Sequence, residues 1–257
     1  MKLEERILKD IHFGLIKWIK EILKDIGGNK VVIGISGGKD SSIVAALCVE
    51  ALGKNNVIGV LMPDGPQQDI SFAYEICEYL DIHNITIPID SITKIYLQSI
   101  DDIKKDIVPE VTAKTKLNLP PRVRMTILYG ISQSIPKSRV VHTGNLSEKW
   151  IGYTTLYGDN TGAFSPLGML TSSEVIQLGR FIGLPEKFIE KPPADGLTGK
   201  TDETVLGFSY DILNKYIREG IIEDKLIKEK IDNLHRSNLF KFTQPPVFTV
   251  DLPIYGE

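Results

Sequence analysis

The chain has 257 residues, of which 42% are hydrophobic and 25% charged, and its 30 Lys and Arg against 33 Asp and Glu leave a formal net charge of −3. This composition is typical of a globular protein, and the length fits one large domain spanning 1–257. A near-neutral charge without a long basic block excludes the electrostatic footprint of proteins that bind duplex nucleic acid or an anionic membrane. We therefore expect neither nucleic acid nor membrane among its partners.

Cysteine usage and the N-terminal stretch bear on the cellular compartment. The two cysteines, Cys48 and Cys77, lie in apolar stretches with a helical pattern, so they cannot form a disulfide framework or a Cys-rich zinc site. The N-terminal stretch mixes charged and apolar residues without a cleavage site, and no run reaches the roughly 18 apolar residues of a membrane span. These features predict a protein of the reducing cytoplasm.

The first half of the chain alternates helix and strand signals. Apolar residues at three- and four-residue spacing predict an amphipathic helix over 3–26. Short apolar runs predict strands at 31–35, 57–63 and 84–89. Stretches with helical periodicity predict helices at 41–53 and 69–81. Near-continuous apolar strands that alternate with helices indicate an α/β fold with a parallel sheet.

The pattern loosens beyond residue 100. A helix is predicted over 118–135 and a strand over 139–145. The segment 152–168 carries four glycines and little periodicity, which is typical of a long loop that binds a ligand, and we interpret it as lid-like. Helices are predicted again at 172–185 and in the C-terminal region 202–239, where they cover 202–218 and 223–235.

The segment GISGGKDSS, residues 34–42, joins the first predicted strand to the next helix. Glycines at such a turn let backbone amides approach a phosphate, and the helix N-terminus adds partial positive charge. The spacing differs from that of a Walker loop and of a dinucleotide fingerprint. A plain alternative is a tight turn with Ser41 capping the helix and Asp40 near its dipole. Hydroxyls, amides and a carboxylate together favour a phosphate site, and the carboxylate implies a divalent cation beside the phosphate.

At this loop the sequence resembles the N-type ATP pyrophosphatases, and over nearly the whole chain it is similar to the ammonia-dependent NAD synthetases. The stretches that carry the resemblance are GISGGKDSS, VIGVLMPDG, NLPPRVRM, HTGNLSE, GYTTLYGD, KPPADGL and GKTDETVLGFSY. The resemblance implies a single Rossmann-like domain, a doubly wound parallel sheet of the adenine nucleotide alpha hydrolase type, that forms a homodimer. It also implies that ATP and Mg²⁺ drive the amidation of deamido-NAD by ammonia through an adenylated intermediate, with release of AMP and pyrophosphate.

The resemblance also assigns residues to ATP and to the metal. Asp40 and Glu148 would hold Mg²⁺ and thereby take part in catalysis. A plain alternative for Glu148 is an acid in the first turn of a helix. The residues assigned to ATP are Gly34, Ile35, Ser36, Gly37, Gly38, Lys39, Asp40, Ser41 and Thr143.

Five residues are assigned to deamido-NAD: Arg122, Tyr157, Asp159, His235 and Arg236. Asp159 is also our candidate for the catalytic group that takes a proton from ammonium. Plain alternatives are a surface ion pair for Arg122 and a solvated turn for Asp159. His235 and Arg236 stand near the C-terminus, where the family has a His-Lys pair.

Several positions depart from the family pattern. Leu156 stands where many members have a basic residue, Ala163 where they have a second Asp, and Ala194 where they have Thr or Ser. Ser172 replaces a lysine that is often assigned to an ATP phosphate. These departures leave open a paralogue that adenylylates a different acceptor. A nucleotide sensor without turnover is a further alternative, but two metal carboxylates argue against it.

The source of the amide nitrogen follows from what precedes the first predicted strand. Glutamine-dependent relatives carry an extra domain with a nucleophilic cysteine, whereas only about 30 residues precede the first strand here. Cys48 and Cys77 fit a hydrophobic core better than a reactive site. The sequence therefore predicts that free ammonia, or ammonia from a separate donor protein, supplies the amide nitrogen.

Overall fold

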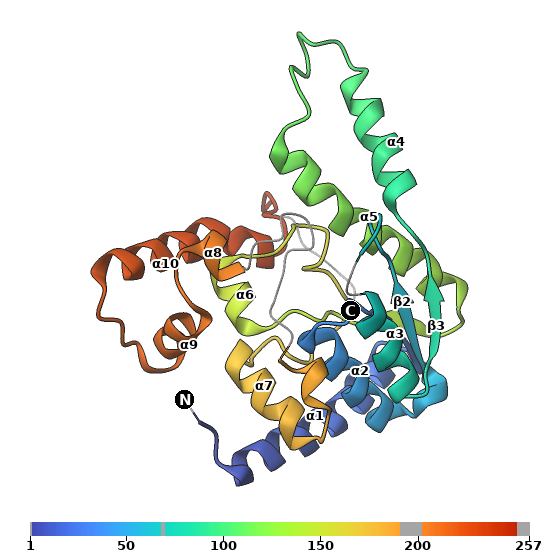
Figure 1. The fold of residues 1–257 in the computed structure, drawn as a ribbon, viewed down its shortest axis with the longest axis vertical. Coiled ribbons are helices and arrows are strands. Elements are labelled where there is room, and N and C mark those ends of the chain that lie inside the picture. Colours follow the sequence, from blue (N-terminus) through green and yellow to red (C-terminus); the bar gives the residue numbers. More distant parts are fainter. Residues whose placement is uncertain (1, 68–69, 191–201, 251–257) are drawn as a thin grey trace.

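The sheet has four strands, all parallel, in the order β3-β2-β1-β4 (Figure 1). The computed structural model describes residues 2–67, 70–190 and 202–250. The strands are β1 Lys30–Gly34, β2 Val57–Leu61, β3 His83–Thr86 and β4 Ser138–Val140. In register, Val32 of β1 lies opposite Ile58 on one side and Val140 on the other. The β1 and β2 interiors are buried because both faces of the sheet are covered, as parallel strands require.

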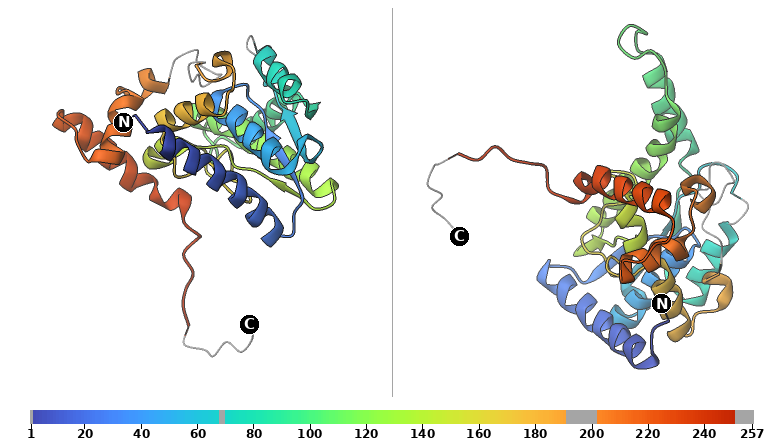
Figure 2. Two further views of the ribbon diagram at one scale, coloured as in Figure 1. Left: turned by 90° about the horizontal axis from the view of Figure 1, so that it is seen from below. Right: turned by 90° about the vertical axis from the view of Figure 1, so that its left-hand side faces the viewer.

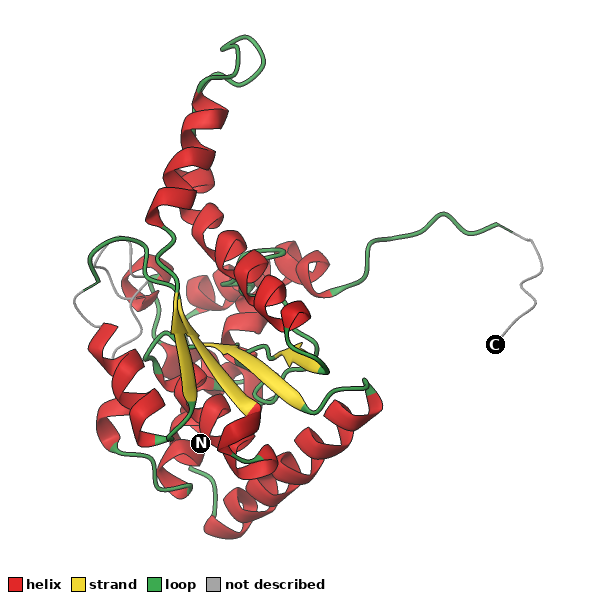
Figure 3. Cartoon of the chain, turned by 90° about the vertical axis from the view of Figure 1, so that its right-hand side faces the viewer, coloured by secondary structure: helices red, strands yellow, loops and turns green. Residues whose placement is uncertain are grey.

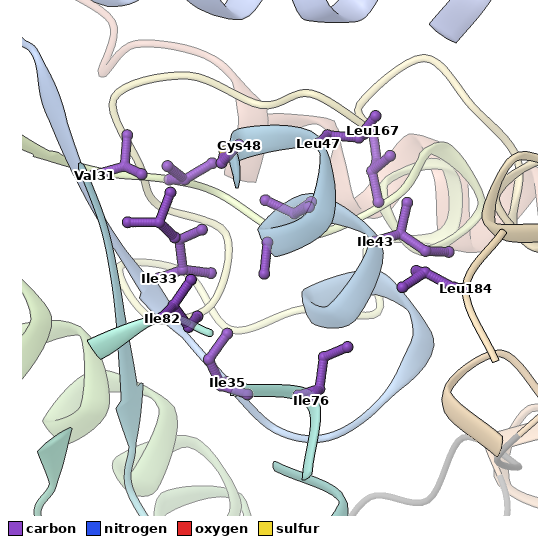
Figure 4. Packing of buried hydrophobic residues seen from close by; sticks show 14 of the residues in the cluster. Val31, Ile33, Ile35, Ile43, Leu47, Cys48, Ile76, Ile82, Leu167 and Leu184 are labelled. Atoms are coloured by element: carbon purple, nitrogen blue, oxygen red, sulfur yellow. The ribbon is translucent and has the colours of Figure 1, made fainter. Parts of the chain in front are cut away.

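One face of the sheet is covered by four helices: α1 Glu5–Asp25, α2 Lys39–Leu52, α3 Ile70–Tyr79 and α7 Ser172–Phe181. Their apolar sides join Ile33 and Ile35 in the largest hydrophobic cluster. Figure 4 shows Ile43, Leu47 and Cys48 of α2 within this packing. Helix α1 occupies most of the predicted range 3–26, since its apolar stripe packs on α2 and α7.

The other face is covered by α5 Ala113–Ser134, and Ile92 near the start of α4 Asp90–Asp101 packs there with it. Val123 and Leu128 of α5 pack with Val32, Val60 and Val140 of the sheet in a second cluster. Helices thus cover both faces (Figure 3), which confirms the expected doubly wound α/β fold.

Helix α5 begins earlier than predicted, at Ala113 instead of residue 118, and Thr112 caps it by accepting a hydrogen bond from Thr115 N. Pro120 and Pro121 lie inside the helix, although proline usually ends one. Packing of the apolar face of α5 on the sheet offsets the lost amide donors. The helix α4, the turn 102–112 and the first turns of α5 project together from the body, and we call this segment, 90–119, the arm (Figure 1).

The C-terminal helices form a third cluster beside α6 Leu146–Ile151. The predicted helix 202–218 is wrong as a single element, because Gly207 adopts a φ of +74° and separates α8 from α9. The bounds are α8 Asp202–Leu206, α9 Tyr210–Glu219 and α10 Lys225–Asn238. Beyond α10 and a 3-10 turn the chain extends away from the body over 243–250 (Figure 2).

Three 3-10 helices complete the described secondary structure: η1 Lys54–Asn56, η2 Glu186–Phe188 and η3 Leu239–Phe242.

The segment 152–168 holds no helix or strand of its own, but its second half is hydrogen-bonded to β4 and the residues that follow it. Ala163 N donates to Val140 O at 2.8 Å, and His142 N donates to Phe164 O at 3.0 Å. The free edge of β4 thereby fixes the end of this segment. Among the described helices, none is long and apolar enough to cross a bilayer.

Candidate active site

The candidate site lies where the strand order reverses. The chain goes from β1 through α2 to β2 on one side of β1, and it reaches β4 on the other side only after α5. In doubly wound sheets, ligands bind at the carboxyl ends of the two strands that flank this point. The loops that leave β1 and β4 meet here, since Asn145 Nδ2 donates to Asp40 Oδ1 at 3.2 Å.

The conformation of the loop after β1 is set by its glycines and by its own hydroxyls. Gly37 has a φ of +74°, and a Cβ there would lie 2.7 Å from the backbone nitrogen of Ala73 in α3, so only glycine fits. Ser41 Oγ and Ser42 Oγ both donate to Gly38 O, at 3.1 and 2.8 Å. The first amides of α2 have no acceptor within their helix, which suits the loop to act as a cradle for anions.

The acidic residue of the loop is paired with its neighbour. Lys39 Nζ donates to Asp40 Oδ2 at 2.7 Å, and the lysine side chain is 9% exposed. Burial alone would lower the pKa of Lys39, but the charges of Asp40, Glu148 and Asp202 raise it above its usual value. Lys39 is therefore a buried ammonium surrounded by carboxylates.

Glu148 has two roles in the structure. It forms a capping box at the start of α6, where Asn145 Oδ1 accepts from Glu148 N and Glu148 Oε2 accepts from Asn145 N, each at 3.2 Å. It is thus a helix acid in the first turn, as the plain interpretation proposed. Its carboxyl also faces Asp40, and burial together with the charge of Asp40 raises the pKa of Glu148 to about 8.

This pair of carboxylates fits a magnesium ion. Two repelling carboxylates are stabilised by a divalent cation between them, and Mg²⁺ prefers oxygen ligands from one or two carboxylates plus phosphate. Within the described residues no three His, Cys, Asp or Glu side chains are grouped to hold a metal, so phosphate oxygens and water would complete the coordination.

Two further residues of the site were missed from the sequence, Asp202 and Tyr210. Tyr210 Oη donates to Asp202 Oδ2 at 3.4 Å. Burial and the charges of Glu148, Asp202 and Asp40 raise the pKa of Tyr210 well above its usual range. Both belong to the stretch GKTDETVLGFSY that supports the resemblance, so the motif itself was the available signal.

Thr143 follows β4 at the carboxyl edge and is partly buried, next to His142. His142 Nδ1 and Ser165 Oγ are 2.8 Å apart, and burial lowers the pKa of His142. This contact ties the segment 152–168 to the residue beside Thr143. The predicted ATP residues of both loops thus lie at the same edge of the sheet.

Three of the five residues assigned to the acceptor, Arg122, Tyr157 and Asp159, lie on α5 or in the segment 152–168 that contacts it. Arg122 Nε donates to Leu156 O at 3.1 Å, so its contact is a carbonyl instead of the ion pair considered from the sequence. Asp159 Oδ1 accepts from Thr155 N at 2.6 Å, as a turn residue does. Tyr157 is 66% exposed with a φ of +60°.

His235 and Arg236 make their described contacts elsewhere. The His235 ring stacks on Trp150 at 4.3 Å and shares a hydrogen bond with Trp150 O, while Arg236 donates to Asn233 within α10. A nearby lysine that the sequence patterns did not single out reaches the loop instead. Lys241 Nζ donates to Gly152 O and Thr154 O at 2.8 and 2.9 Å.

The departures from the family pattern lie in different surroundings. Ser172 is buried in a network in which its amide donates to Ser147 Oγ and its hydroxyl accepts from Asn214 Nδ2. Leu156 is partly buried and Ala163 is exposed. Ala194 lies outside the described residues.

Both cysteines lie in the core, as the sequence indicated. Cys48 and Cys77 are fully buried free thiols. Burial raises the pKa of Cys48 to about 12 and that of Cys77 to about 11, which leaves neither with the thiolate character of a nucleophile.

Fold and site are those of a nucleotide-binding α/β protein, with a glycine loop and paired carboxylates at the carboxyl edge of a parallel sheet. The family model for NAD synthase matches residues 12–245. The chain therefore belongs to the NAD synthase family, which confirms the resemblance.

Individual relatives agree. An NH3-dependent NAD(+) synthetase of Archaeoglobus fulgidus is 35% identical over 240 residues, covering 91% of this chain and 94% of the relative. The structure of NMN synthetase from Francisella tularensis has a TM-score of 0.84 at 27% identity and covers 98% of this chain and 100% of that one. An NH3-dependent NAD synthetase from Campylobacter jejuni, in complex with nitrate, has a TM-score of 0.76 at 28% identity, with coverage of 96% and 100%.

Proposed function

We propose that this chain is a ligase that uses ATP to amidate deamido-NAD with ammonia, forming NAD, AMP and pyrophosphate. The observation that carries the proposal is the anion cradle of the loop 34–42 directly beside the carboxylates of Asp40 and Glu148. Membership of the NAD synthase family supplies the substrates. The protein itself contributes mainly positioning and electrostatic stabilisation.

In the first step the carboxylate of deamido-NAD attacks the α-phosphorus of ATP, and pyrophosphate leaves. The amides at the start of α2 and the hydroxyls of Ser36 and Ser41 would hold the phosphates, while Thr143 would contact ATP from the adjacent strand. Asp40 and Glu148 would hold Mg²⁺, which supplies charge neutralisation at the phosphates. The resulting acyl-adenylate keeps the carboxyl carbon activated for the second step.

In the second step ammonia displaces AMP. Asp159 is exposed, and its Oδ1 is committed to the turn, so we propose that Oδ2 takes the proton from ammonium. Arg122 and Tyr157 on the same surface would contact the dinucleotide. A role for His235 and Arg236 toward deamido-NAD stays a prediction, because their described contacts are with α6 and α10.

We also propose a homodimer that works in the cytoplasm. The arm exposes apolar side chains that have no cover within the described chain, with Ile95 66%, Tyr96 54% and Ile107 69% exposed. A second copy of this chain would cover them. Two buried free thiols suit a reducing compartment.

A second candidate function is amidation of a smaller pyridine nucleotide. Of the two structures compared, the enzyme named as an NMN synthetase has the higher TM-score, 0.84 against 0.76. Leu156 and Ala163 are uncharged where the family pattern has a basic and an acidic group, so contacts expected for the dinucleotide are absent at these two positions. Comparing kcat/KM for deamido-NAD and for nicotinic acid mononucleotide distinguishes the two candidates.

The decisive experiment incubates the purified chain with ATP, Mg²⁺, ammonium and deamido-NAD. We expect NAD and AMP in equal amounts, no NAD when glutamine replaces ammonium, and no product from Asp40→Asn. ATP binding without AMP formation would show a sensor instead, and AMP formed only with another acceptor would show a paralogous ligase.

A further inference from the structure

Lys39 is a lysine inside the phosphate loop itself. It is the first residue of α2, and its side chain is buried although lysine is rarely buried without a partner. Its ammonium donates to Asp40 Oδ2 at 2.7 Å. The charges of Glu148 and Asp202 also favour the ammonium form.

This arrangement conflicts with the binding of a triphosphate unless the cation changes partner. ATP brings negative charge to a place that already has carboxylates, and a metal that binds Asp40 competes with the ammonium for the same oxygen. The lysine stem has four rotatable bonds, so the ammonium can move while its Cα stays in the first turn of α2. A phosphate bound at the amides of the first turn of α2 would then supply another anionic partner, and lysine binds phosphate well as a point charge.

We propose that Lys39 is an exchangeable counter-ion, which neutralises Asp40 while no nucleotide is bound and moves onto the ATP phosphates when the metal takes Asp40. The inference rests on the proposed function, because it requires metal and ATP at this loop. Lys39 thereby keeps the carboxylates of the empty site paired and supplies a cation to the phosphates of the filled one.

The test uses Lys39→Met, which keeps the length of the side chain and removes its charge. Removing the ammonium leaves Asp40 without its partner, so the nucleotide-free variant should bind Mn²⁺ about threefold or more tightly than wild type, as measured by electron paramagnetic resonance. The same variant should bind ATP with Mg²⁺ about tenfold or more weakly by isothermal titration calorimetry, because a charge-assisted contact to phosphate is lost.

A matched control removes the same charge elsewhere. Lys54 lies just after α2 and forms an exposed ion pair with Asp81, which Lys54→Met breaks. The affinities for Mn²⁺ and for ATP with Mg²⁺ should both stay at the wild-type values. Lys39→Arg, which keeps the charge, should recover most of the ATP affinity.

The opposite changes in the two affinities identify the exchange. Unchanged Mn²⁺ affinity in Lys39→Met would overturn the proposal, since Lys39 would then not compete for Asp40. Unchanged ATP affinity would overturn it as well, since Lys39 would then not reach phosphate. Both readouts are independent of the acceptor, so failure of wild type to form NAD would count against the proposed function alone.

Discussion

At the scale of single residues, Glu148 combines a structural contact at a helix start with the position of a proposed metal ligand. As the third residue of α6 it accepts the amide of Asn145 and completes the capping box, and its carboxyl lies beside Asp40. Glutamine can serve equally well at this position of a capping box. The substitution Glu148→Gln therefore removes the charge while the cap is retained.

We expect Glu148→Gln to lower the rate of AMP formation by about a hundredfold or more, because a carboxylate that helps hold Mg²⁺ is worth several kcal/mol at the phosphates. Steady-state AMP release measures the effect. Glu148→Ala should lose the rate and the cap together, so a Glu148→Gln enzyme with wild-type activity would show that Glu148 serves the helix only.

Without metal the same variant should be more stable than wild type above neutral pH. The folded-state pKa of Glu148, about 8, is higher than the ordinary value for glutamate of about 4.3, so the folded state binds this proton more tightly. Stability of wild type therefore falls as pH rises from about 4.3 to about 8, whereas this contribution is absent in Glu148→Gln. Melting temperatures in EDTA at pH 5 and pH 8 measure it, and a difference that does not grow with pH would contradict the assignment.

At the scale of elements, the C-terminal helices are held to the body by an ion pair between a buried glutamate and a partly exposed arginine. Glu174 in the first turn of α7 accepts from Arg218 of α9 at 2.7 and 2.6 Å and from Thr171 N at 2.8 Å. Glu174 is 3% exposed, and Arg218 also donates to Met169 O. Because α6 packs against both α7 and α9, this pair helps to hold Glu148 in place.

Glu174→Gln should lower the free energy of unfolding at pH 7 by roughly 2–4 kcal/mol, through loss of two charge-assisted hydrogen bonds. Burial alone would raise the pKa of Glu174, but the bonds from Arg218 and Thr171 lower it below its usual value. Its contribution is therefore complete above the unfolded pKa of about 4.3 and is lost as pH falls through the lower folded value. Urea unfolding at pH 7 and pH 3 should show the difference shrinking at the lower pH.

The control is Glu186→Gln, which breaks the exposed pair with Arg180. Its effect on unfolding should be much smaller, because solvent screens such pairs. An equal loss of unfolding free energy in Glu174→Gln and Glu186→Gln would contradict the prediction, because Glu174 would then contribute no more than an exposed charge.

At the scale of the whole molecule, the exposed apolar side chains of the arm have no packing partner within the described part of the chain. Its helices leave the sheet and carry exposed apolar groups away from the three hydrophobic clusters (Figure 3). A single copy therefore leaves apolar surface in water, and association of two copies would bury it.

If the proposed homodimer forms through the arm, wild type should sediment as a dimer and the double variant Ile95→Lys with Ile107→Lys as a monomer, because buried charges oppose association. Ile221→Lys is the matched control, since Ile221 is 51% exposed outside the arm, and it should stay dimeric. A double variant that remains a dimer would place the interface elsewhere.

Much of the fold can be predicted from local patterns in the sequence. These patterns determined the parallel α/β class, because buried strands and amphipathic helices each leave a periodic signature within a few residues. The segment 34–42 likewise pointed to a phosphate site, since glycines, hydroxyls and a carboxylate act there within one turn of chain. The break at Gly207 was missed because a helical pattern on both sides concealed one left-handed residue.

The sequence by itself determined the family, the sheet and the loop, all of which are encoded in contiguous residues. Only the tertiary structure decided which distant side chains meet: Asn145 with Asp40, Tyr210 with Asp202, and Lys241 with the carbonyl of Gly152. It also placed the His235 ring on that of Trp150, a contact that the sequence did not predict. The physical reason is that such contacts depend on how helices pack and on the direction of side chains, and local periodicity in the sequence determines neither.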